Sequence, residues 1–293
     1  MVSRIALIGQ PVRHSVAAAV QEAALGAEGL DVTIEPMERR PHELAAAVSE
    51  VRAGDDFIGA MVASPHKDRV PPLVDALSED ARATGAVNTV VRAGGRLEGH
   101  NTDVAGIRAG LTAILPPVVG RWPKQAVVLG AGAAARAVVA VLISSGFLRI
   151  AVFNRHLHRA EALVTHFKRM ARHMDLRAMP WHETIVESEL ARAKLLVNAT
   201  VIGLEEGESA LEPDTLAHEL FVLDLVLNHP RTRLMDEAEQ RGGVVANGQT
   251  AFLTSSAASF RLWTGRDAPL DAMRTALATE LGLPDEAITV AGD

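Results

Sequence analysis

The sequence predicts an α/β protein with two domains, and three observations lead to this class. The chain has 293 residues, too many for one ordinary core, and 48% of them are apolar, so two cores can be filled. Short apolar runs alternate with segments of helical spacing, as in a largely parallel sheet covered by helices. Within residues 125–140 an apolar run, a glycine-containing turn and a helical segment follow one another directly, as in a nucleotide-binding fold.

Composition excludes several classes of function. The net charge of −7 and the scattered Lys and Arg residues disfavour a nucleic-acid partner. The absence of cysteine excludes disulfides, Cys-ligated zinc and a thiol nucleophile, and the absence of tyrosine excludes a Tyr-based general acid. No signal-peptide core or membrane span is evident, so we expect a cytoplasmic enzyme. No cluster of His, Asp and Glu has the spacing of metal ligands, so we expect no metal.

The first half alternates strands with helices. Ligands of such sheets bind beyond the carboxyl ends of the strands, where Ser15 and Lys67 fall in this chain. The predicted strands are 4–8, 31–36 and 57–62, and the predicted helices run from the loop after Pro11 to about residue 25 and over 41–51.

A hairpin is predicted at Gly94-Gly95, because this pair separates two short strand-like runs. The hairpin would bring Asn88 and Asp103 toward one another. We also expect a helix from about 72 to 77 before the hairpin and one over 104–115 after it, where Pro116-Pro117 interrupts the pattern.

The second half repeats the alternation, and a long helical pattern then follows. The expected strands are 150–153, 195–200 and 221–225, with a helix over about 158–173. The segment 250–263 is predicted to be a buried helix that folds back on the first domain. We therefore assign residues 1–104 to a substrate domain, 105–247 to a Rossmann-type dinucleotide domain and 248–293 to C-terminal helices.

The turn after the apolar run 126–129 has the GxGxxA form of a dinucleotide-binding turn. Gly130 permits the sharp bend, Gly132 leaves no side chain between backbone and pyrophosphate, and Ala135 allows helix and strand to approach closely. The phosphates are expected on free N–H groups of the helix N-terminus, beside Ala131, Ala133 and Ala134. Turns of this form also occur for packing alone.

The ribose-proximal position favours NADP over NAD. The strand 150–153 ends at Asn154, where an NAD enzyme usually carries Asp or Glu, and Arg155 and Arg159 follow. Their guanidinium groups can hold a 2′-phosphate by charge-assisted hydrogen bonds. The alternative is that both arginines simply face solvent at the start of a helix.

In combination, these motifs resemble the shikimate dehydrogenase family over nearly the whole chain. Each motif alone is unspecific, but their common order is not. The matching stretches are Gly9-Gln10-Pro11 with His14-Ser15, Pro65-His66-Lys67, Gly85-Ala86-Val87-Asn88-Thr89, His100-Asn101-Thr102-Asp103, 130–137, Asn154-Arg155 with Arg159-Ala160, Asn198-Ala199-Thr200 and Trp263-Thr264-Gly265.

The resemblance implies an α/β fold with two domains and an interdomain cleft, NADP in the second domain, and reversible oxidation of a ring hydroxyl of a small cyclic polyol acid. It implies that Lys67 and Asp103 form the catalytic pair. It also implies substrate contacts at the positions of Ser15, Ala63, Asn88, Leu227 and Ser255, and further cofactor contacts at Thr200, Val226 and Gly248.

Elementary chemistry supports the catalytic pair independently. Hydride leaves a carbinol carbon only as the hydroxyl proton is removed, so a base must contact that oxygen. Lys67 can exchange this proton, and Asp103 can position the lysine and balance its charge. Each residue also has an ordinary alternative, since surface lysines are common and Asp103 or Ser15 could cap a helix. Asn88 could bind a substrate hydroxyl or satisfy its own turn.

Five polar substrate contacts of the family are weakened or missing. The second Ser of its SxS motif is Ala17 here, its NVT motif is Met61-Val62-Ala63, its tyrosine is Leu227 and its glutamine is Ser255. At about 0.5 to 1.5 kcal/mol for each net hydrogen bond, the loss sums to roughly 2.5 to 7 kcal/mol. We therefore expect a related cyclic hydroxy or keto acid, rather than shikimate, as the best substrate.

Two alternatives stay open. The first is a genuine shikimate or quinate dehydrogenase in which other groups replace the missing contacts. The second is a non-catalytic regulatory protein that binds a metabolite, against which the retention of Lys67 and Asp103 argues. The expected partner is a small cyclic hydroxy acid, with no nucleic acid and no membrane, and the chain is expected to be a monomer or a homodimer.

Overall fold

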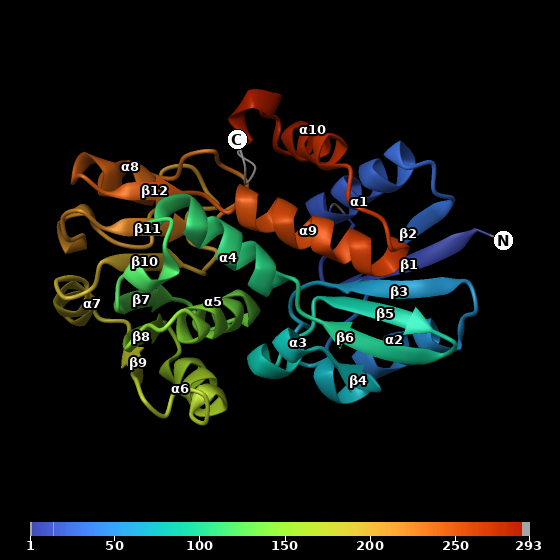
Figure 1. Cartoon of the computed structure of the whole chain (residues 1–293), viewed down its shortest axis with the longest axis horizontal. Coiled ribbons are helices and arrows are strands. Elements are labelled where there is room, and N and C mark those ends of the chain that lie inside the picture. Colours follow the sequence, from blue (N-terminus) through green and yellow to red (C-terminus); the bar gives the residue numbers. More distant parts are fainter. Residues whose placement is uncertain (1, 14, 289–293) are drawn as a thin grey trace. The chain divides into compact units, whose positions relative to one another are not determined.

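The computed structural model describes residues 2–13 and 15–288. This part of the chain divides into two compact units, which we call unit 1 (2–105 and 253–288) and unit 2 (106–252). Each unit is built on a six-stranded sheet, so the predicted α/β class is confirmed (Figure 1). The functional roles assigned above to 1–104, 105–247 and 248–293 stay predictions.

The sheet of unit 1 is mixed, with the strand order β2-β1-β3-β5-β6-β4. Its core strands are buried because the runs that form them are almost wholly apolar, as in Ile5 to Ile8 of β1. Strand β1 pairs in parallel with β2 and β3, whereas β3 pairs antiparallel with β5. The strands are β1 (Ser3–Gly9), β2 (Val32–Glu38), β3 (Phe57–Val62), β4 (Ala76–Leu77), β5 (Thr89–Ala93) and β6 (Arg96–His100).

The predicted hairpin is confirmed, since β5 and β6 pair antiparallel with Ala93 opposite Arg96. Gly94 and Gly95 form the two-residue turn with φ values of 55° and 80°, a conformation that L side chains rarely adopt. The hairpin extends the sheet beside β3 (Figure 1).

The prediction of a helix over 72–77 was wrong. A 3₁₀ turn, η1 (Pro71–Leu73), is followed there by β4, because Asp75 and Ser78 form backbone hydrogen bonds with Leu97 and Gly99 of β6. The helix of this region is instead α3 (Glu79–Thr84). It begins where the Ser78 hydroxyl accepts a bond from the Ala81 N–H and ends at a left-handed Gly85.

The remaining helices of unit 1 are α1 (Val16–Ala27), α2 (Leu44–Ala53), α10 (Leu270–Leu281) and most of α9 (Gln249–Thr264), and the unit ends with the 3₁₀ turn η4 (Asp285–Ala287). The C-terminal part of α9 packs on the first sheet. The Trp263 indole N–H donates to the Val90 carbonyl at 2.9 Å. A Cβ on Gly59 would lie 2.1 Å from that carbonyl oxygen and 2.6 Å from the indole nitrogen, so only glycine fits beneath Trp263.

Unit 2 has the doubly wound order of a Rossmann sheet. Its strand order is β12-β11-β10-β7-β8-β9, and all five pairings are parallel. The strands are β7 (Gln125–Leu129), β8 (Arg149–Asn154), β9 (Asp175–Pro180), β10 (Leu195–Asn198), β11 (Phe221–Asp224) and β12 (Val244–Ala246).

The helices of unit 2 alternate with these strands, as the pattern predicted. Helix α6 is shorter than expected, because after Phe167 the chain continues as turns through residue 173. The elements are α4 (Asp103–Ile114), η2 (Val119–Arg121), α5 (Ala133–Ser144), α6 (Leu157–Phe167), α7 (Glu183–Leu190), η3 (Pro213–Thr215) and α8 (Arg233–Gln240), and α4 and α9 each contribute residues to both units.

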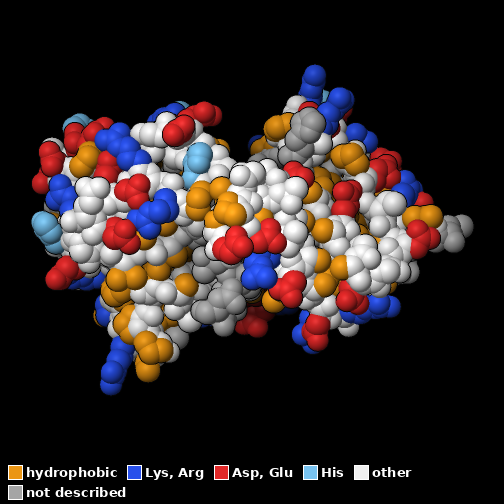
Figure 2. Space-filling model, turned by 90° about the horizontal axis from the view of Figure 1, so that it is seen from above, with side chains coloured by type: hydrophobic (Ala, Val, Ile, Leu, Met, Phe, Trp, Pro, Cys, Tyr) orange, Lys and Arg blue, Asp and Glu red, His pale blue; other side chains and the backbone are white. Residues whose placement is uncertain are grey.

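On the face seen in Figure 2, Lys and Arg side chains are interspersed with Asp and Glu rather than gathered in one basic patch. No helix within residues 2–13 and 15–288 combines the length and the apolar character that a membrane span requires. Over the same residues, no three His, Asp or Glu side chains come together as a metal site.

Candidate functional site

Lys67 and Asp103 form a direct ion pair in unit 1. Lys67 lies in the turn after β3, where its carbonyl accepts a bond from the Val87 N–H at 2.7 Å, and Asp103 is the first residue of α4. The Lys67 Nζ donates to Asp103 Oδ2 at 2.7 Å. The two side chains are 24% and 18% exposed, so the pair is shielded from bulk water yet accessible to a small molecule.

Asn88 holds the other carboxylate oxygen of Asp103. Its Nδ2 donates to Asp103 Oδ1 at 2.9 Å, and its Oδ1 accepts from the Thr102 N–H at 2.9 Å. The predicted approach of Asn88 and Asp103 is therefore confirmed. The amide also donates to Thr102 Oγ1 at 2.7 Å, so Asn88 is bound mainly to the protein. Its predicted contact with substrate is not tested by these bonds and stays a prediction.

Four hydroxyl groups lie behind the ion pair and form a continuous hydrogen-bonded chain. Thr89 contacts Ser259 at 2.7 Å, Ser259 contacts Thr102 at 2.9 Å, and Thr102 contacts Ser255 at 2.9 Å. The Ser255 hydroxyl donates to Asp103 Oδ1 at 3.2 Å. All four hydroxyl residues are 9% exposed or less, so the chain is sheltered from competing water.

Sequence reasoning missed three of these hydroxyl residues. Thr89 and Thr102 stand inside motifs that had been recognised, directly beside Asn88 and Asp103, so their positions carried a signal. Ser259 carried none on its own, although it follows Ser255 by four residues and thus shares its helical face.

In unit 2, the turn after β7 has the geometry of a dinucleotide-binding turn. Gly130 has φ +103°, and a Cβ there would lie 2.6 Å from the Ala199 carbonyl oxygen, so a side chain is excluded. Gly132 is the N-cap of α5, and a Cβ added to it would meet nothing within 4 Å. The backbone there is open to a ligand at a helix N-terminus, which suits a pyrophosphate. Ala135 is fully buried, whereas Ala131, Ala133 and Ala134 occupy the turn and the first helical residues.

The arginines predicted beside the ribose are exposed, and neither forms an ion pair in the part of the chain that the structure describes. Asn154 ends β8 and donates through Nδ2 to the His156 carbonyl at 2.9 Å, which shapes the turn that leads into α6. Arg155 and Arg159 form no ion pair with a carboxylate within residues 2–13 and 15–288. Both guanidinium groups are therefore available to an anionic ligand at the end of β8.

The other predicted cofactor residues also follow ends of parallel strands. Thr200 follows β10, Val226 follows β11 and Gly248 follows β12, so all three lie at the edge of the sheet that carries Gly130 and Asn154. The Gly248 N–H donates to the Val226 carbonyl at 3.2 Å, and a Cβ on Gly248 would lie 2.6 Å from the Leu225 carbonyl oxygen.

A buried carboxylate that sequence reasoning missed organises this edge. Asp224 is fully buried and accepts hydrogen bonds from Asn198 Nδ2 at 2.8 Å, Thr232 Oγ1 at 2.7 Å and the Val226 N–H at 3.2 Å. Burial without a cation among these partners raises the pKa of the Asp224 carboxyl. Asn198 in turn accepts from Thr200 through Oδ1, so Asp224 indirectly fixes the loop after β10.

Three family models match the chain in sequence order. They are the shikimate dehydrogenase substrate binding domain over residues 7–90, shikimate/quinate 5-dehydrogenase over 119–232, and the shikimate 5′-dehydrogenase C-terminal domain over 256–278. The chain belongs to the shikimate dehydrogenase family. The predicted resemblance is therefore confirmed, and the matched ranges contain Lys67, Asn88 and the dinucleotide turn.

Individual relatives agree with this assignment. The shikimate dehydrogenase (NADP(+)) of Methanopyrus kandleri is 37% identical over 280 residues, which cover 94% of this chain and 95% of the relative. The structure of shikimate 5-dehydrogenase from Thermus thermophilus with NADP(H) and shikimate has a TM-score of 0.78 at 35% identity and covers 95% of this chain and 99% of its own. The ligand-free 5-ketofructose reductase of Gluconobacter sp. strain CHM43 has a TM-score of 0.79 at 28% identity, with 95% and 99% coverage.

The other residues predicted at shikimate dehydrogenase substrate positions are distributed over both units. Ser15 is the N-cap of α1 but makes no capping bond through its side chain, so its hydroxyl is not used by the helix. Ala63 follows β3, and its N–H donates to the Ile8 carbonyl at 2.8 Å. Leu227 belongs to unit 2 and follows Val226. His14, which precedes Ser15 in the recognised motif, lies outside the described residues.

Proposed function

We propose that this protein catalyses reversible hydride transfer between NADP(H) and a ring hydroxyl or ketone of a cyclic hydroxy acid, with a best substrate other than shikimate. The observation that carries the proposal is the ion pair of Lys67 and Asp103, with 2.7 Å between Nζ and Oδ2. A shielded ammonium group on a carboxylate, flanked by amide and hydroxyl donors, is suited to exchanging a proton with a substrate hydroxyl.

Lys67 is the group that moves the proton. During oxidation its amine takes the hydroxyl proton while the carbinol carbon loses hydride, and in the reverse direction the ammonium returns the proton to the developing alkoxide. Asp103 stays in contact with the lysine throughout and balances its charge. Because Asn88 and Ser255 both donate to the other Asp103 oxygen, the carboxylate is held against rotation.

The residues of unit 2 fit NADP. The open backbone at Gly132 and the N-terminus of α5 suit the pyrophosphate, and the unpaired Arg155 and Arg159 suit a 2′-phosphate, which a carboxylate at this position would repel. When bound, NADP⁺ supplies the acceptor for the hydride. The cofactor named for the relative from Methanopyrus kandleri supports the same assignment.

The substrate is proposed to differ from shikimate because polar side chains are missing where the family binds it. Ala17, Met61, Ala63 and Leu227 are apolar at such positions. Ser255 keeps a hydroxyl there, but that hydroxyl donates to Asp103. A ligand with fewer hydroxyls, or with a carboxylate held by other groups, suits such a pocket better, since each unmatched polar group costs about 1 to 3 kcal/mol on burial.

Two alternatives compete with this proposal. The first is a genuine shikimate or quinate dehydrogenase. The names of the matched family models and relatives favour it. The structural similarity to a 5-ketofructose reductase instead favours a different substrate, because it indicates that this fold can accommodate one. The second is a regulatory protein that binds a metabolite without converting it, against which the intact ion pair speaks. A cytoplasmic location and a monomeric or homodimeric state remain predictions.

The decisive experiment follows the absorbance of NADPH at 340 nm with purified protein, a panel of cyclic hydroxy acids that includes shikimate and quinate, and both NADP⁺ and NAD⁺. We expect turnover with NADP⁺ and a kcat/KM for another acid at least 100-fold above that for shikimate. Robust turnover at micromolar shikimate would instead establish the first alternative, and no turnover with any acid would favour the second.

A variant tests the role of the ion pair. Lys67→Ala should lower kcat by about 10² to 10⁴, the range expected for one general acid–base group, with little change in NADP⁺ affinity. Lys194→Ala, which removes an exposed lysine paired with Glu219 in unit 2, is the matched control and should keep full activity. Unchanged turnover in Lys67→Ala would remove Lys67 from the mechanism.

A further inference from the structure

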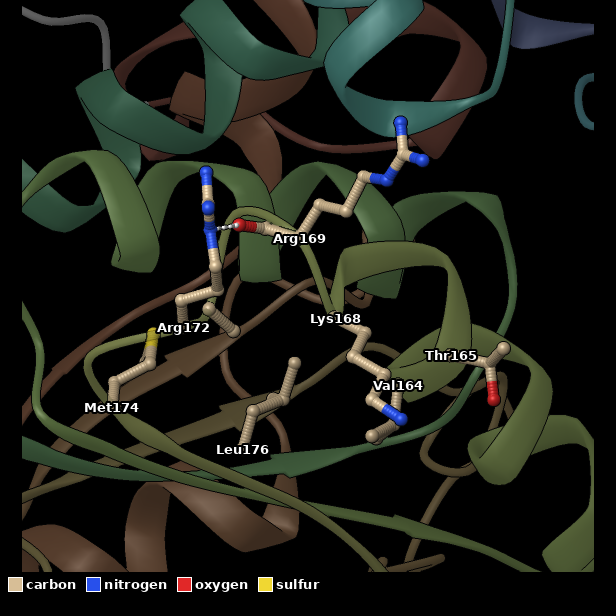
Figure 3. A pocket seen from close by; sticks show the side chains of 8 residues that line it. Val164, Thr165, Lys168, Arg169, Arg172, Met174 and Leu176 are labelled. Atoms are coloured by element: carbon tan, nitrogen blue, oxygen red, sulfur yellow. Dashed lines mark hydrogen bonds between the residues drawn. The ribbon is translucent and has the colours of Figure 1, made fainter.

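A pocket of about 720 Å³ opens between the C-terminal end of α6 and the start of β9. Three cationic side chains line it, Lys168, Arg169 and Arg172, together with an apolar wall of Val164, Met174 and Leu176. Its volume lies within the range of about 300 to 1,000 Å³ that is usual for small-molecule sites. In Figure 3, Arg172 extends upward from the turn and Arg169 extends to the upper right, whereas Lys168 points downward, alongside Val164.

This pocket is separate from the dinucleotide edge of unit 2. The predicted cofactor residues follow the carboxyl ends of the parallel strands, as Asn154 does at the end of β8. The pocket lies at the other edge, since β9 begins at Asp175 beside Arg149 at the start of β8. The 11 residues of α6 separate the two edges. At 1.5 Å of rise for each residue, this distance is roughly 16 Å.

The described part of the chain leaves the positive charge of the pocket without ion-pair partners. Within residues 2–13 and 15–288, no carboxylate pairs with Lys168, Arg169 or Arg172. The nearest acidic residue along the chain, Asp175, is already engaged by Arg149 at 3.1 Å and by Arg177 at 3.1 Å. From residue 155 to 173 the sequence has five Lys and Arg residues against the single acidic Glu161, in a chain whose net charge is −7.

One internal bond fixes part of this arrangement. The Arg172 Nε donates to the Arg169 carbonyl at 3.1 Å, which leaves the two terminal nitrogens of its guanidinium group for a ligand (Figure 3). The negative end of the helix dipole accounts for cations at the end of α6, but not for a hollow with a half-buried aliphatic wall beside them. Cations and apolar surface together suit a ligand that carries both an anionic group and a hydrophobic body.

We propose that this pocket binds a small organic anion, a carboxylate or phosphate ester attached to an apolar ring. The guanidinium groups of Arg169 and Arg172 would hold the anionic oxygens through charge-assisted bonds, and the ring would cover Val164, Met174 and Leu176. The inference goes beyond the proposed function, because none of these residues belongs to the catalytic pair or to the dinucleotide edge.

Isothermal titration calorimetry with 1-naphthyl phosphate tests the proposal, in the presence of saturating NADP⁺ so that a dinucleotide site on the protein is filled. We expect binding of one equivalent, with at least tenfold weaker binding of 1-naphthol, which lacks the charge, and of inorganic phosphate, which lacks the ring. 1-Naphthoate in place of the phosphate ester distinguishes a carboxylate from a phosphate as the preferred anion, and binding of either supports the proposal.

The double variant Arg169→Gln/Arg172→Gln should weaken binding of 1-naphthyl phosphate at least tenfold. Arg192→Gln is the matched control, since Arg192 is an exposed arginine of the same unit and has no ion-pair partner within the described residues. Equal affinity in the double variant and wild type would overturn the proposal. So would equal affinity for 1-naphthol or inorganic phosphate, or binding seen only without NADP⁺, which would indicate the dinucleotide site instead. Circular dichroism of the variants verifies their folding.

Discussion

The hydrogen bond from Ser255 to Asp103 leads to a prediction that separates orientation of the proposed catalytic pair from contact with substrate. Ser255→Ala removes a donor 3.2 Å from Asp103 Oδ1 and a partner 2.9 Å from Thr102 Oγ1. Asp103 retains the Asn88 amide at 2.9 Å and the Lys67 ammonium at 2.7 Å. The variant therefore loosens the carboxylate without releasing it.

The size of the expected change in kcat follows from the geometry of the lost hydrogen bond. At 3.2 Å the contact is long for a hydroxyl donor, so we assign it the energy of a neutral bond, about 0.5 to 1.5 kcal/mol. Because each 1.36 kcal/mol is tenfold in rate, kcat should fall by about 2- to 12-fold. KM should stay nearly constant, because Ser255 is only 9% exposed and its hydroxyl donates to Asp103.

Steady-state kinetics of the substrate found in the screen provide the assay. The matched control is Ser256→Ala, because Ser256 is the next residue on α9, is equally buried at 8% and makes no hydrogen bond with Asp103. An increase in KM at unchanged kcat in Ser255→Ala would refute the reasoning and show that Ser255 binds substrate. Asn88→Ala, which removes the shorter bond, should reduce kcat further, by about 10- to 100-fold.

Three further predictions concern the cofactor edge and stability. Arg155→Gln/Arg159→Gln should raise KM for NADP⁺ by about 10²-fold and leave KM for NAD⁺ unchanged, since two charge-assisted bonds are lost, and initial rates with both cofactors measure this. Gly59→Ala should lower the free energy of unfolding by about 1 to 3 kcal/mol in urea titrations, because its Cβ would lie 2.1 Å from the Val90 carbonyl oxygen. Asp224→Asn should remove one contribution to the pH dependence of the free energy of unfolding, measured by urea titrations at several pH values. Because burial raises the pKa of Asp224 in the folded state, wild type should lose stability relative to this variant as pH rises from about 4, and a constant difference would contradict the assignment.

Much of the fold followed from local patterns. The apolar runs of β1, β3 and β8 and the two-glycine turn of the hairpin each indicate a single local conformation, and the structure agrees with them. The sequence after Pro71 does not indicate a single local conformation. Its conformation depends on backbone bonds from Asp75 and Ser78 to β6, which is more than 20 residues away, so no local pattern could reveal that Ala76 and Leu77 are a strand.

The candidate site was predictable where motif order carried the information. Lys67, Asn88 and Asp103 were recognised because they stand in stretches with a known order, and the hairpin explains why two of them meet. The hydrogen bonds that hold the site residues in place could not be predicted from the sequence. Ser259 and Thr89 are 170 residues apart and become neighbours only when α9 packs on the sheet, and nothing in the sequence around Asp224 indicates three buried donors directed at it.

Ser255 is one of the positions at which the resemblance implies a polar substrate contact, a glutamine in the family. Under the proposed function, the exchange of this glutamine for serine shortens the side chain and removes a polar group from the substrate pocket. The shorter side chain brings its hydroxyl to Asp103 Oδ1 and to Thr102 Oγ1, where it completes the hydroxyl chain with Ser259 and Thr89. If the proposed function holds, one substitution both weakens recognition of a polar ligand and adds a donor to the carboxylate that contacts Lys67. The proposed function requires an exchange of this kind, which leaves the ion pair of Lys67 and Asp103 in place.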